Sequence, residues 1–245
     1  MLLSAAALIG GSLAARAFAD AFDQVLLRWT KWEKVVDEDG SNLEVRATYY
    51  SAEYIEAMIQ KEAKDNLWTQ NEVDDYKYKF LSNLKLEELI PINIKFINNG
   101  PTMYLGPFDI MVKLRIGNKT YKPSDYDRRF NFKFQGEKEG LVFFPRFDEK
   151  TGKDLLKGVN SVSLEFSPAI SPLLEARVIR FVWTVADDNP QKLYEGKAAG
   201  KLETDRLIKR LEKLRKDKTE EESKLSAING EIDTIQKRLD ELAKQ

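Results

Sequence analysis

The residue types of this chain limit the chemistry that it can perform. Its 245 residues include no Cys and no His. That composition excludes thiol nucleophiles, disulfides, Ser-His and Cys-His catalytic pairs, and zinc or haem sites in their usual forms. An enzyme would have to use carboxylates, Lys or Tyr, and spacing marks out no pair among the 40 acidic residues. We therefore predict a protein that is not an enzyme and has no catalytic residue, cofactor or metal site.

One polar stretch between two predicted strands could bind a sugar or a phosphate. It gathers charged side chains around one aromatic ring: Asp125, Tyr126, Asp127, Arg128 and Arg129. Binding residues are concentrated on loops, which makes this stretch a candidate site. A charged loop cluster is also commonly no more than a solvated surface, and that alternative stays open.

A second stretch, Asn99 to Pro107, is the most apolar of the predicted loops. Its residues Met103 and Tyr104 would offer an exposed contact to a partner, although Tyr104 could equally pack in the core. Together the two stretches predict a ligand loop that contains Met103, Tyr104, Asp125, Tyr126 and Arg128.

These candidate loops lie in a block of residues, 88 to 185, in which short predicted strands follow one another. Turn residues separate the strands, and no helical pattern lies between them, which favours an antiparallel sandwich over a parallel sheet. The predicted strands are Glu88–Asn98, Phe108–Ile116, Lys119–Lys122, Phe130–Phe134, Leu141–Phe147, Val159–Phe166 and Glu175–Val185.

Four segments of this block resemble the immunoglobulin-like domains of bacterial secreted and cell-envelope proteins. They are Ile90–Gly100, Met103–Pro107, Lys119–Pro123 and Gly140–Pro145. The resemblance is one of pattern over roughly a hundred residues and carries no catalytic signature. It implies an immunoglobulin-like β-sandwich that serves binding and scaffolding.

Helical patterns precede the strand block. Residues 20 to 36 are ambiguous: they predict a helix that gives way to a strand near Glu33, while the acidic turn Asp37–Gly40 before a strand from Leu43 to Tyr50 also suggests a hairpin. Ser51 to Asn66 predicts a helix capped by Ser51, and Thr69 with Glu72 forms a capping box at the start of a second helix. We expect this helical pair, residues 51–84, to cover one face or end of the sheets.

The N-terminus predicts export. Residues 2–15 are uncharged and mostly apolar, and Ala17-Phe18-Ala19 follows Arg16. A short apolar run that ends in Ala-x-Ala is typical of a cleaved signal peptide, here residues 1–19. The run is too short for a comfortable transmembrane helix, so we expect a periplasmic or extracellular protein with no membrane span after cleavage. An N-terminal helix buried against the body is the alternative.

The C-terminal part, residues 201–245, follows a polar linker, residues 187–200, and has a heptad pattern. With Leu211 at position a, nine of the twelve a and d positions are Leu or Ile, which is typical of a coiled coil. The nine residues form what we name the seam: Leu207, Leu211, Leu214, Leu225, Ile228, Ile232, Ile235, Leu239 and Leu242. We expect one continuous helix, with a hairpin that bends near Lys216–Glu222 or Asn229–Gly230 as an alternative. A single helix packed along the sandwich is another.

Charges beside the seam favour an antiparallel partner. In a parallel, in-register pair, flanking positions would bring like charges together: Arg210 to Arg215 and Asp217 to Glu222. In an antiparallel pair the g positions meet as complementary pairs: Glu203 with Arg238, Arg210 with Glu231, and Asp217 with Lys224. Lys218 and Glu221 would lie near the crossing centre and set the register.

The combined prediction is a mainly β protein with α-helices. It consists of an immunoglobulin-like antiparallel β-sandwich, residues 20–186, with a helical insert, and a C-terminal coiled-coil helix. We expect an exported scaffold or interaction protein that binds a protein partner, itself or another, through the helix. It would not bind nucleic acid, because the net charge is only −1 and no basic residues interleave with aromatics. A carbohydrate-binding or carboxylate-based carbohydrate-active protein is one alternative, and an adaptor that docks its helix on an envelope protein complex is another.

Overall fold

The computed structural model describes residues 21–194 and 197–243. The predicted signal peptide, residues 1–19, lies outside them. The chain divides into two compact units, Met1–Glu195 and Gly196–Gln245, and each is described by itself.

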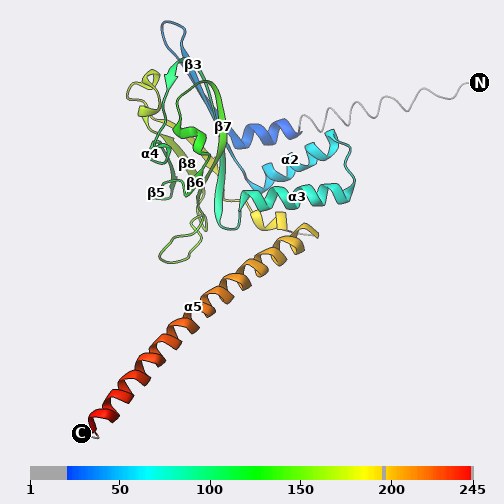
Figure 1. The fold of residues 1–245 in the computed structure, drawn as a ribbon. Coiled ribbons are helices and arrows are strands. Elements are labelled where there is room, and N and C mark those ends of the chain that lie inside the picture. The colour runs from blue at the N-terminus through cyan, green and yellow to red at the C-terminus, as the bar shows by residue number, and fades with distance from the viewer. Residues whose placement is uncertain (1–20, 195–196, 244–245) are drawn as a thin grey trace, which may run out of the picture. The chain divides into compact units, whose positions relative to one another are not determined.

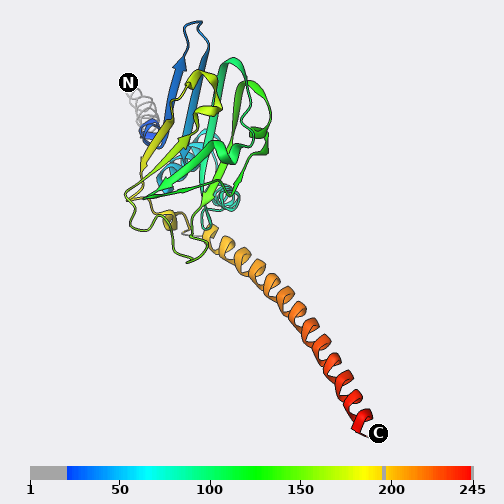
Figure 2. The same cartoon turned by 90° about the vertical axis from the view of Figure 1, so that its left-hand side faces the viewer.

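The first unit contains two antiparallel sheets (Figure 1), which confirms the predicted pair of sheets. The five-stranded sheet has the order β1-β2-β3-β7-β6, from Thr30–Val36, Asn42–Tyr49, Leu89–Met103, Phe134–Pro145 and Asp125–Tyr126. The four-stranded sheet has the order β5-β4-β8-β9, from Lys119–Tyr121, Val112–Ile116, Ser161–Phe166 and Ile179–Thr184. Figure 2 looks onto the four-stranded sheet.

Alternation along the strands places one face of each sheet in a shared core. On β4, Val112, Leu114 and Ile116 are buried, whereas Lys113 and Arg115 between them are exposed. This period-two pattern buries apolar side chains between the sheets and leaves the charged ones in water. Phe96 on β3 and Trp183 on β9 are among the largest fully buried side chains of this core.

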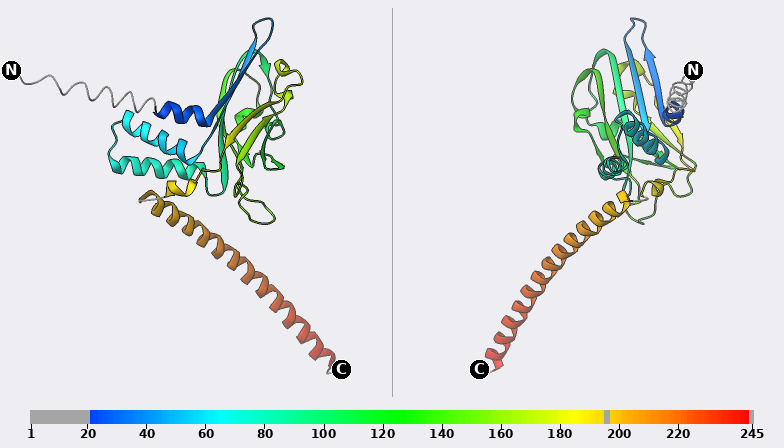
Figure 3. Two further views of the ribbon diagram at one scale, coloured as in Figure 1. Left: turned by 180° about the vertical axis from the view of Figure 1, so that it is seen from behind. Right: turned by 90° about the vertical axis from the view of Figure 1, so that its right-hand side faces the viewer.

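Three helices lie on one side of the sheets (Figures 1 and 3). They are the helix at 21–29, α2 at Ala52–Asp65 and α3 at Gln70–Leu84. Both predicted caps are confirmed. The Ser51 hydroxyl accepts the backbone N–H of Tyr54 at 3.0 Å, and the Glu72 carboxylate accepts the backbone N–H of Thr69 at 2.7 Å.

The two longer helices bury side chains against each other. Ile55 and Ile59 on α2 and Leu81 and Leu84 on α3 are at most 1% exposed, and none of them belongs to the cluster between the sheets. The helical pair therefore has a small core of its own, as expected for two amphipathic helices packed face to face.

Short helical segments lie between the strands and after the last one. They are α4 at Phe108–Met111, η1 at Arg128–Asn131, η2 at Pro168–Ile170, η3 at Pro172–Leu174 and η4 at Pro190–Tyr194. The last one lies in the stretch predicted as a polar linker, and its Leu193 is only 2% exposed.

The prediction of one strand from Phe108 to Ile116 is wrong in its first half. Phe108–Met111 forms the helical turn α4, which leaves Phe108 buried and Ile110 45% exposed. The strand partner explains the difference. Pairing with β8 ends at Val112 opposite Phe166, so the preceding residues have no ladder to join. The Ile110 N–H donates instead to the Pro107 carbonyl.

Other strand boundaries also differ from prediction. Phe130–Phe134 was expected to be extended, but η1 occupies its first two residues because the Asp127 side chain accepts the Arg129 N–H and nucleates a turn. The turn expected at 98–100 does not end β3. The buried Asn98 side chain accepts the N–H of Gly100 and donates to the Pro101 carbonyl, so the strand bulges and continues to Met103.

The N-terminal helix gives way to a strand at Thr30, three residues earlier than the predicted change near Glu33, and β1 then forms the expected hairpin with β2. The second unit is one helix, α5, from Lys197 to Ala243. It continues through Lys216–Glu222 and through Asn229–Gly230 without a break, so the predicted continuous helix is confirmed and the hairpin is wrong.

Candidate functional site

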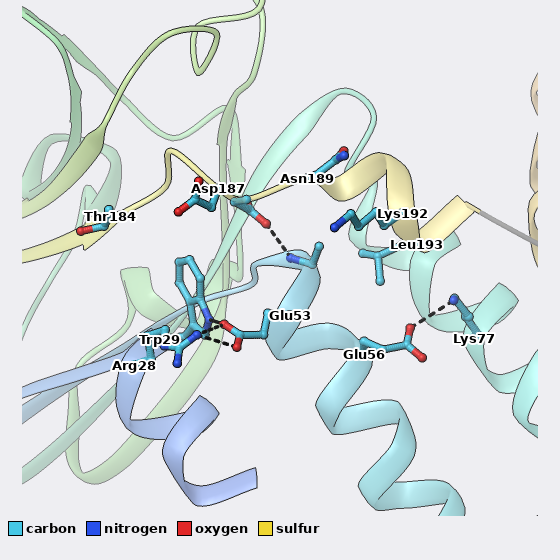
Figure 4. A pocket seen from close by; sticks show the side chains of 12 residues that line it. Arg28, Trp29, Glu53, Glu56, Lys77, Thr184, Asp187, Asn189, Lys192 and Leu193 are labelled. Atoms are coloured by element: carbon cyan, nitrogen blue, oxygen red, sulfur yellow. Dashed lines mark hydrogen bonds and ion pairs between the residues drawn. The ribbon is translucent and has the colours of Figure 1, made fainter. Parts of the chain in front are cut away.

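A cavity of the first unit lies where the helix at 21–29, α2 and α3 meet the segment after β9 (Figure 4). Its volume is about 680 Å³, within the range typical of small-molecule sites. The residues that line it are Arg28, Trp29, Ala52, Glu53, Glu56, Lys77, Thr184, Asp187, Asp188, Asn189, Lys192 and Leu193.

Glu53, in the first turn of α2, is the most fully bonded carboxylate of the cavity. It accepts two hydrogen bonds from the Arg28 guanidinium, at 2.6 and 2.8 Å, and one from the Trp29 indole at 2.7 Å. A carboxylate in the first turn of a helix also interacts favourably with the helix dipole. These three hydrogen bonds attach the helix at 21–29 to the start of α2.

Asp188 attaches the end of the second sheet to the same helix. Its carboxylate accepts the backbone N–H of Ala52, the first residue of α2, at 2.8 Å, and the hydroxyl of Tyr49 donates to it as well. Burial raises the pKa of Asp188 above its ordinary value, while these two hydrogen bonds and the charge of Arg146 oppose the rise.

Tyr49 connects Asp188 to the aromatic core. Burial and the neighbouring Asp188 carboxylate raise its pKa well above the usual range. Its ring stacks on Trp29, with centroids 5.5 Å apart, and lies 5.9 Å from the ring of Trp183. The Trp183 indole in turn donates to the Trp29 carbonyl at 2.8 Å. The cavity wall and the sandwich core are therefore continuous.

Most charges around the cavity are already paired. Arg28 bonds Glu53, and Lys77 donates to Glu56 at 3.1 Å. Asp187 and Lys192 are exposed at the rim. Among the residues that the structure describes, no group of three acidic side chains is placed to hold a metal ion. The bonded groups mainly hold elements together, and only the rim groups are open to a ligand.

Sequence reasoning did not find this cavity. Asp187 to Asn189 belonged to the predicted linker, and Arg28 and Trp29 to an ambiguous helix. Their partners are distant in the chain: Glu53 is 24 residues from Trp29, and Ala52 is 136 residues from Asp188. The one local signal was an acidic residue in the first turn of a well-capped helix, which requires no distant partner.

The predicted ligand loop is divided by the structure. Met103 is 2% exposed, so the expectation of an exposed Met103 is wrong: it ends β3 opposite Phe134 and packs in the core. Tyr104 is 56% exposed, as expected of a contact residue. Tyr126 on β6 is buried, with its ring 5.5 Å from that of Phe108.

Asn131, which the sequence did not mark, joins the two predicted stretches. Its side chain accepts the backbone N–H of Phe108 at 3.0 Å and donates to the hydroxyl of Tyr126 at 3.1 Å. Its carbonyl also lies beside Gly106, next to the ring of Tyr104. The structure thus brings the two stretches together through Asn131, which belongs to neither of them.

The charges of this loop region bond largely to one another. Arg129 forms an ion pair with Asp127 at 2.6 Å, which lowers the pKa of that carboxyl. Arg128 lies over the Tyr126 ring, 4.7 Å from its centroid, and 3.9 Å from Asp125. A ligand that stacked on Tyr126 would have to displace the Arg128 guanidinium.

The seam of α5 is exposed along its full length. All nine predicted seam residues, which are listed above, are between 46% and 59% exposed, and Ile208 beside them is 49% exposed. An exposed apolar stripe of this length, interrupted only by two charged positions at its centre, is unusual on a soluble surface and typically marks an association site. The remaining surface of the helix is charged, with ion pairs such as Lys216–Glu220 and Arg238–Glu241.

No family model matches this chain, and neither do the curated proteins nor the solved structures with which it was compared. In the described part of the chain, no helix is both long and apolar enough to cross a membrane.

Proposed function

We propose that this chain is a non-enzymatic interaction protein, in which a β-sandwich body carries a C-terminal helix that binds another helix. The single observation that carries the proposal is the exposed seam of α5. Each Leu or Ile that moves from half exposure to burial contributes on the order of 1 kcal/mol, so a seam of nine such residues supplies a strong driving force.

The body is proposed to be immunoglobulin-like, and the strand order supports this. The order β2-β3-β7-β6 corresponds to strands A, B, E and D of an immunoglobulin domain, and β5-β4-β8-β9 to strands C′, C, F and G. The helical pair α2–α3 is then an insertion between A and B, and β1 is an extra edge strand. Trp183 is fully buried on β9, which would be strand G, whereas such domains carry a buried Trp on strand C. An experimental structure without the β4–β8 pairing would contradict the assignment.

Export to the cell envelope is part of the proposal and is supported by the signal-peptide pattern of residues 1–19. Expression of the full chain with its own N-terminus tests it. Mass spectrometry should find a mature protein that begins at Asp20. An intact N-terminus on all the protein would contradict export by cleavage.

A second contact is proposed at the exposed Tyr104, which would present the sandwich to another partner. The carbohydrate alternative has less support, because Arg128 covers the Tyr126 ring on which a sugar would stack. A glycan array tests it: binding that is lost with Asp125→Ala would favour the alternative over a protein partner.

Light scattering on residues 20–245 across a concentration series tests association through the seam. The double variant Ile228→Ser/Ile232→Ser should shift the mass to that of a monomer, because it makes two seam positions polar. Ser and Ile have similar helix propensity, so the helix itself should persist. Ala227→Ser, at the outward-facing c position, is the matched control and should keep the mass of the parent protein.

Two results would contradict this function. One is a double variant that associates as well as the parent, since association would then not use the seam. The other is a parent chain that is monomeric throughout the series and binds no added helical partner. A shortened chain used for comparison should end after Tyr194, because Leu193 is buried in the first unit.

A further inference from the structure

We propose that the partner of α5 is α5 of a second copy, antiparallel, in one register in which Lys218 of each chain lies opposite Glu221 of the other. This inference depends on the proposed association through the seam. It names the partner and the alignment, which association alone leaves undetermined.

Two charged residues lie between the apolar residues of the seam. Lys218 occupies an a position and Glu221 a d position, and in the single chain both are more than 70% exposed. Each is paired within its own helix: Lys218 lies 3.5 Å from Glu222, and Lys224 lies 2.6 Å from Glu221. Pairs between exposed groups on a helix contribute only a few tenths of a kcal/mol, so they are easily exchanged for others.

A parallel pair of α5 helices would bury like charges. In a parallel, in-register coiled coil each a residue faces the same a residue, and each d the same d. Lys218 would face Lys218, and Glu221 would face Glu221, at the centre of an otherwise apolar seam. Like charges in a desolvated interface cost several kcal/mol. The parallel arrangement is therefore strongly disfavoured.

An antiparallel pair places a residues opposite d residues, which removes this conflict. If Lys218 lies opposite Glu221 of the second chain, the two-fold axis passes between them and generates the same pair twice. The neighbouring layers are then apolar throughout: Leu214 with Leu225, Leu211 with Ile228, and Leu207 with Ile232. Each Leu or Ile of these three layers therefore has an apolar partner.

The flanking charges agree with this register. The g positions bring Asp217 of one chain beside Lys224 of the other. On the opposite flank, the e positions bring Arg215 beside Glu222. Together with the seam pair, the six central charges of each chain meet opposite charges. The apolar layers supply affinity, while these pairs select the orientation.

A shift of one heptad in either direction reverses the electrostatics. A shift one way brings Asp217 to Asp217 and Arg215 to Arg215. A shift the other way brings Lys224 to Lys224 and Glu222 to Glu222. Both shifts also place Lys218 opposite a Leu or Ile, which leaves its charge buried without a partner. The proposed register is therefore favoured over the two neighbouring registers. Polar residues at seam positions specify the register of other coiled coils in the same way.

Disulfide trapping in the full chain tests the geometry. The chain contains no Cys, so each introduced thiol is the only reactive one. Leu214→Cys, carrying a mass tag, is mixed with untagged Leu225→Cys and oxidised slowly in a thiol buffer. In the proposed register these positions share a layer, within the Cα separation of up to about 7 Å that a disulfide spans. We expect the tagged–untagged dimer to be the main product.

Two mixtures serve as matched controls. Leu214→Cys alone forms a disulfide only in a parallel dimer, since in the proposed one the two thiols lie 11 residues, about 16 Å, apart along the axis. Leu214→Cys with Ile232→Cys forms one only in a register shifted by a heptad, about 10 Å. Both should yield less than a tenth of the heterodimer.

A charge exchange gives an independent test by sedimentation equilibrium. Lys218→Glu faces Glu221 twice and should weaken the dimer at least tenfold. Lys218→Glu/Glu221→Lys restores two opposite pairs and should restore the affinity. In a parallel dimer the double variant would be no better than the single one.

The outcomes separate this inference from the proposed function. A dimer that crosslinks as Leu214–Leu214 or Leu214–Ile232 overturns the register but keeps association through the seam. A monomer at every concentration, with or without oxidation, overturns self-association altogether. Failure of the Ile228→Ser/Ile232→Ser variant to reduce association contradicts the seam, whatever the register.

Discussion

Removal of the Asp188 carboxylate should destabilise the first unit. In Asp188→Ala, the N–H of Ala52 and the hydroxyl of Tyr49 both lose their acceptor. An unsatisfied buried donor costs about 1–3 kcal/mol. Tyr49 is only 2% exposed, so its hydroxyl would incur that cost in full. The N–H of Ala52 would incur less, because water in the cavity can reach it. We therefore expect a loss of about 2–4 kcal/mol in the free energy of unfolding.

Asp188→Asn separates the charge from the hydrogen bonds, because Asn keeps an oxygen acceptor. Burial raises the pKa of Asp188 in the folded chain above its unfolded value of about 3.9. The folded state then holds the proton more tightly than the unfolded state. The associated stability is fully present below about pH 3.9 and is lost as the pH rises through the folded pKa. The free energy of unfolding of the parent relative to Asp188→Asn should fall over that interval and stay level above it.

Urea unfolding followed by Trp fluorescence measures both effects, because all four Trp residues lie in the first unit. Asp187→Ala and Asp187→Asn are the matched controls: the neighbouring Asp187 is exposed, and its change should alter stability by no more than about 0.5 kcal/mol. The reasoning is refuted if Asp188→Ala costs no more than Asp187→Ala. It is also refuted if the stability of the parent relative to Asp188→Asn rises with pH.

Three other substitutions test the architecture by thermal denaturation. Ser51→Ala removes the cap of α2 and should cost about 0.5–2 kcal/mol; an unchanged melting temperature would mean that the cap contributes nothing. Met103→Ala should cost about 2–5 kcal/mol because it leaves a cavity in the core, while Tyr104→Ala should change stability by about 0.5 kcal/mol or less, and the opposite ranking would contradict the burial described above. Trp183→Phe leaves the buried Trp29 carbonyl without its donor and should cost about 1–3 kcal/mol of stability. An unchanged melting temperature would mean that another donor reaches that carbonyl.

Features that depend on nearby residues were predictable from the sequence. The caps at Ser51 and Thr69, the hairpin of β1 and β2, and the unbroken α5 all follow from contacts within a few residues. The seam was predictable for the same reason, since a seven-residue repeat indicates which side of a helix is apolar. Two antiparallel sheets were also predictable, because strands that follow one another without helices leave little other choice.

Features that depend on distant partners were decided only by the tertiary structure. The alternating pattern of Phe108–Ile116 is real, but half of it is helical because β8 offers no partner beyond Val112. Met103 lies in a stretch whose composition predicts a loop. It is buried because β3 bulges at Asn98 and continues. Periodicity reports which residues prefer burial, and it does not report where a neighbouring strand ends.

The candidate cavity shows most clearly the difference between features that depend on nearby residues and features that depend on distant ones. The sequence alone determined that this chain has a long helix with an apolar stripe and patterned charges beside it, because both properties follow from its local repeat. It gave no sign that Asp188 would meet Ala52 across 136 residues, or that Glu53 would meet Trp29 across 24. Those bonds exist because the packing of the sheets and helices brings the ends of distant elements together. Only the folded core can do that.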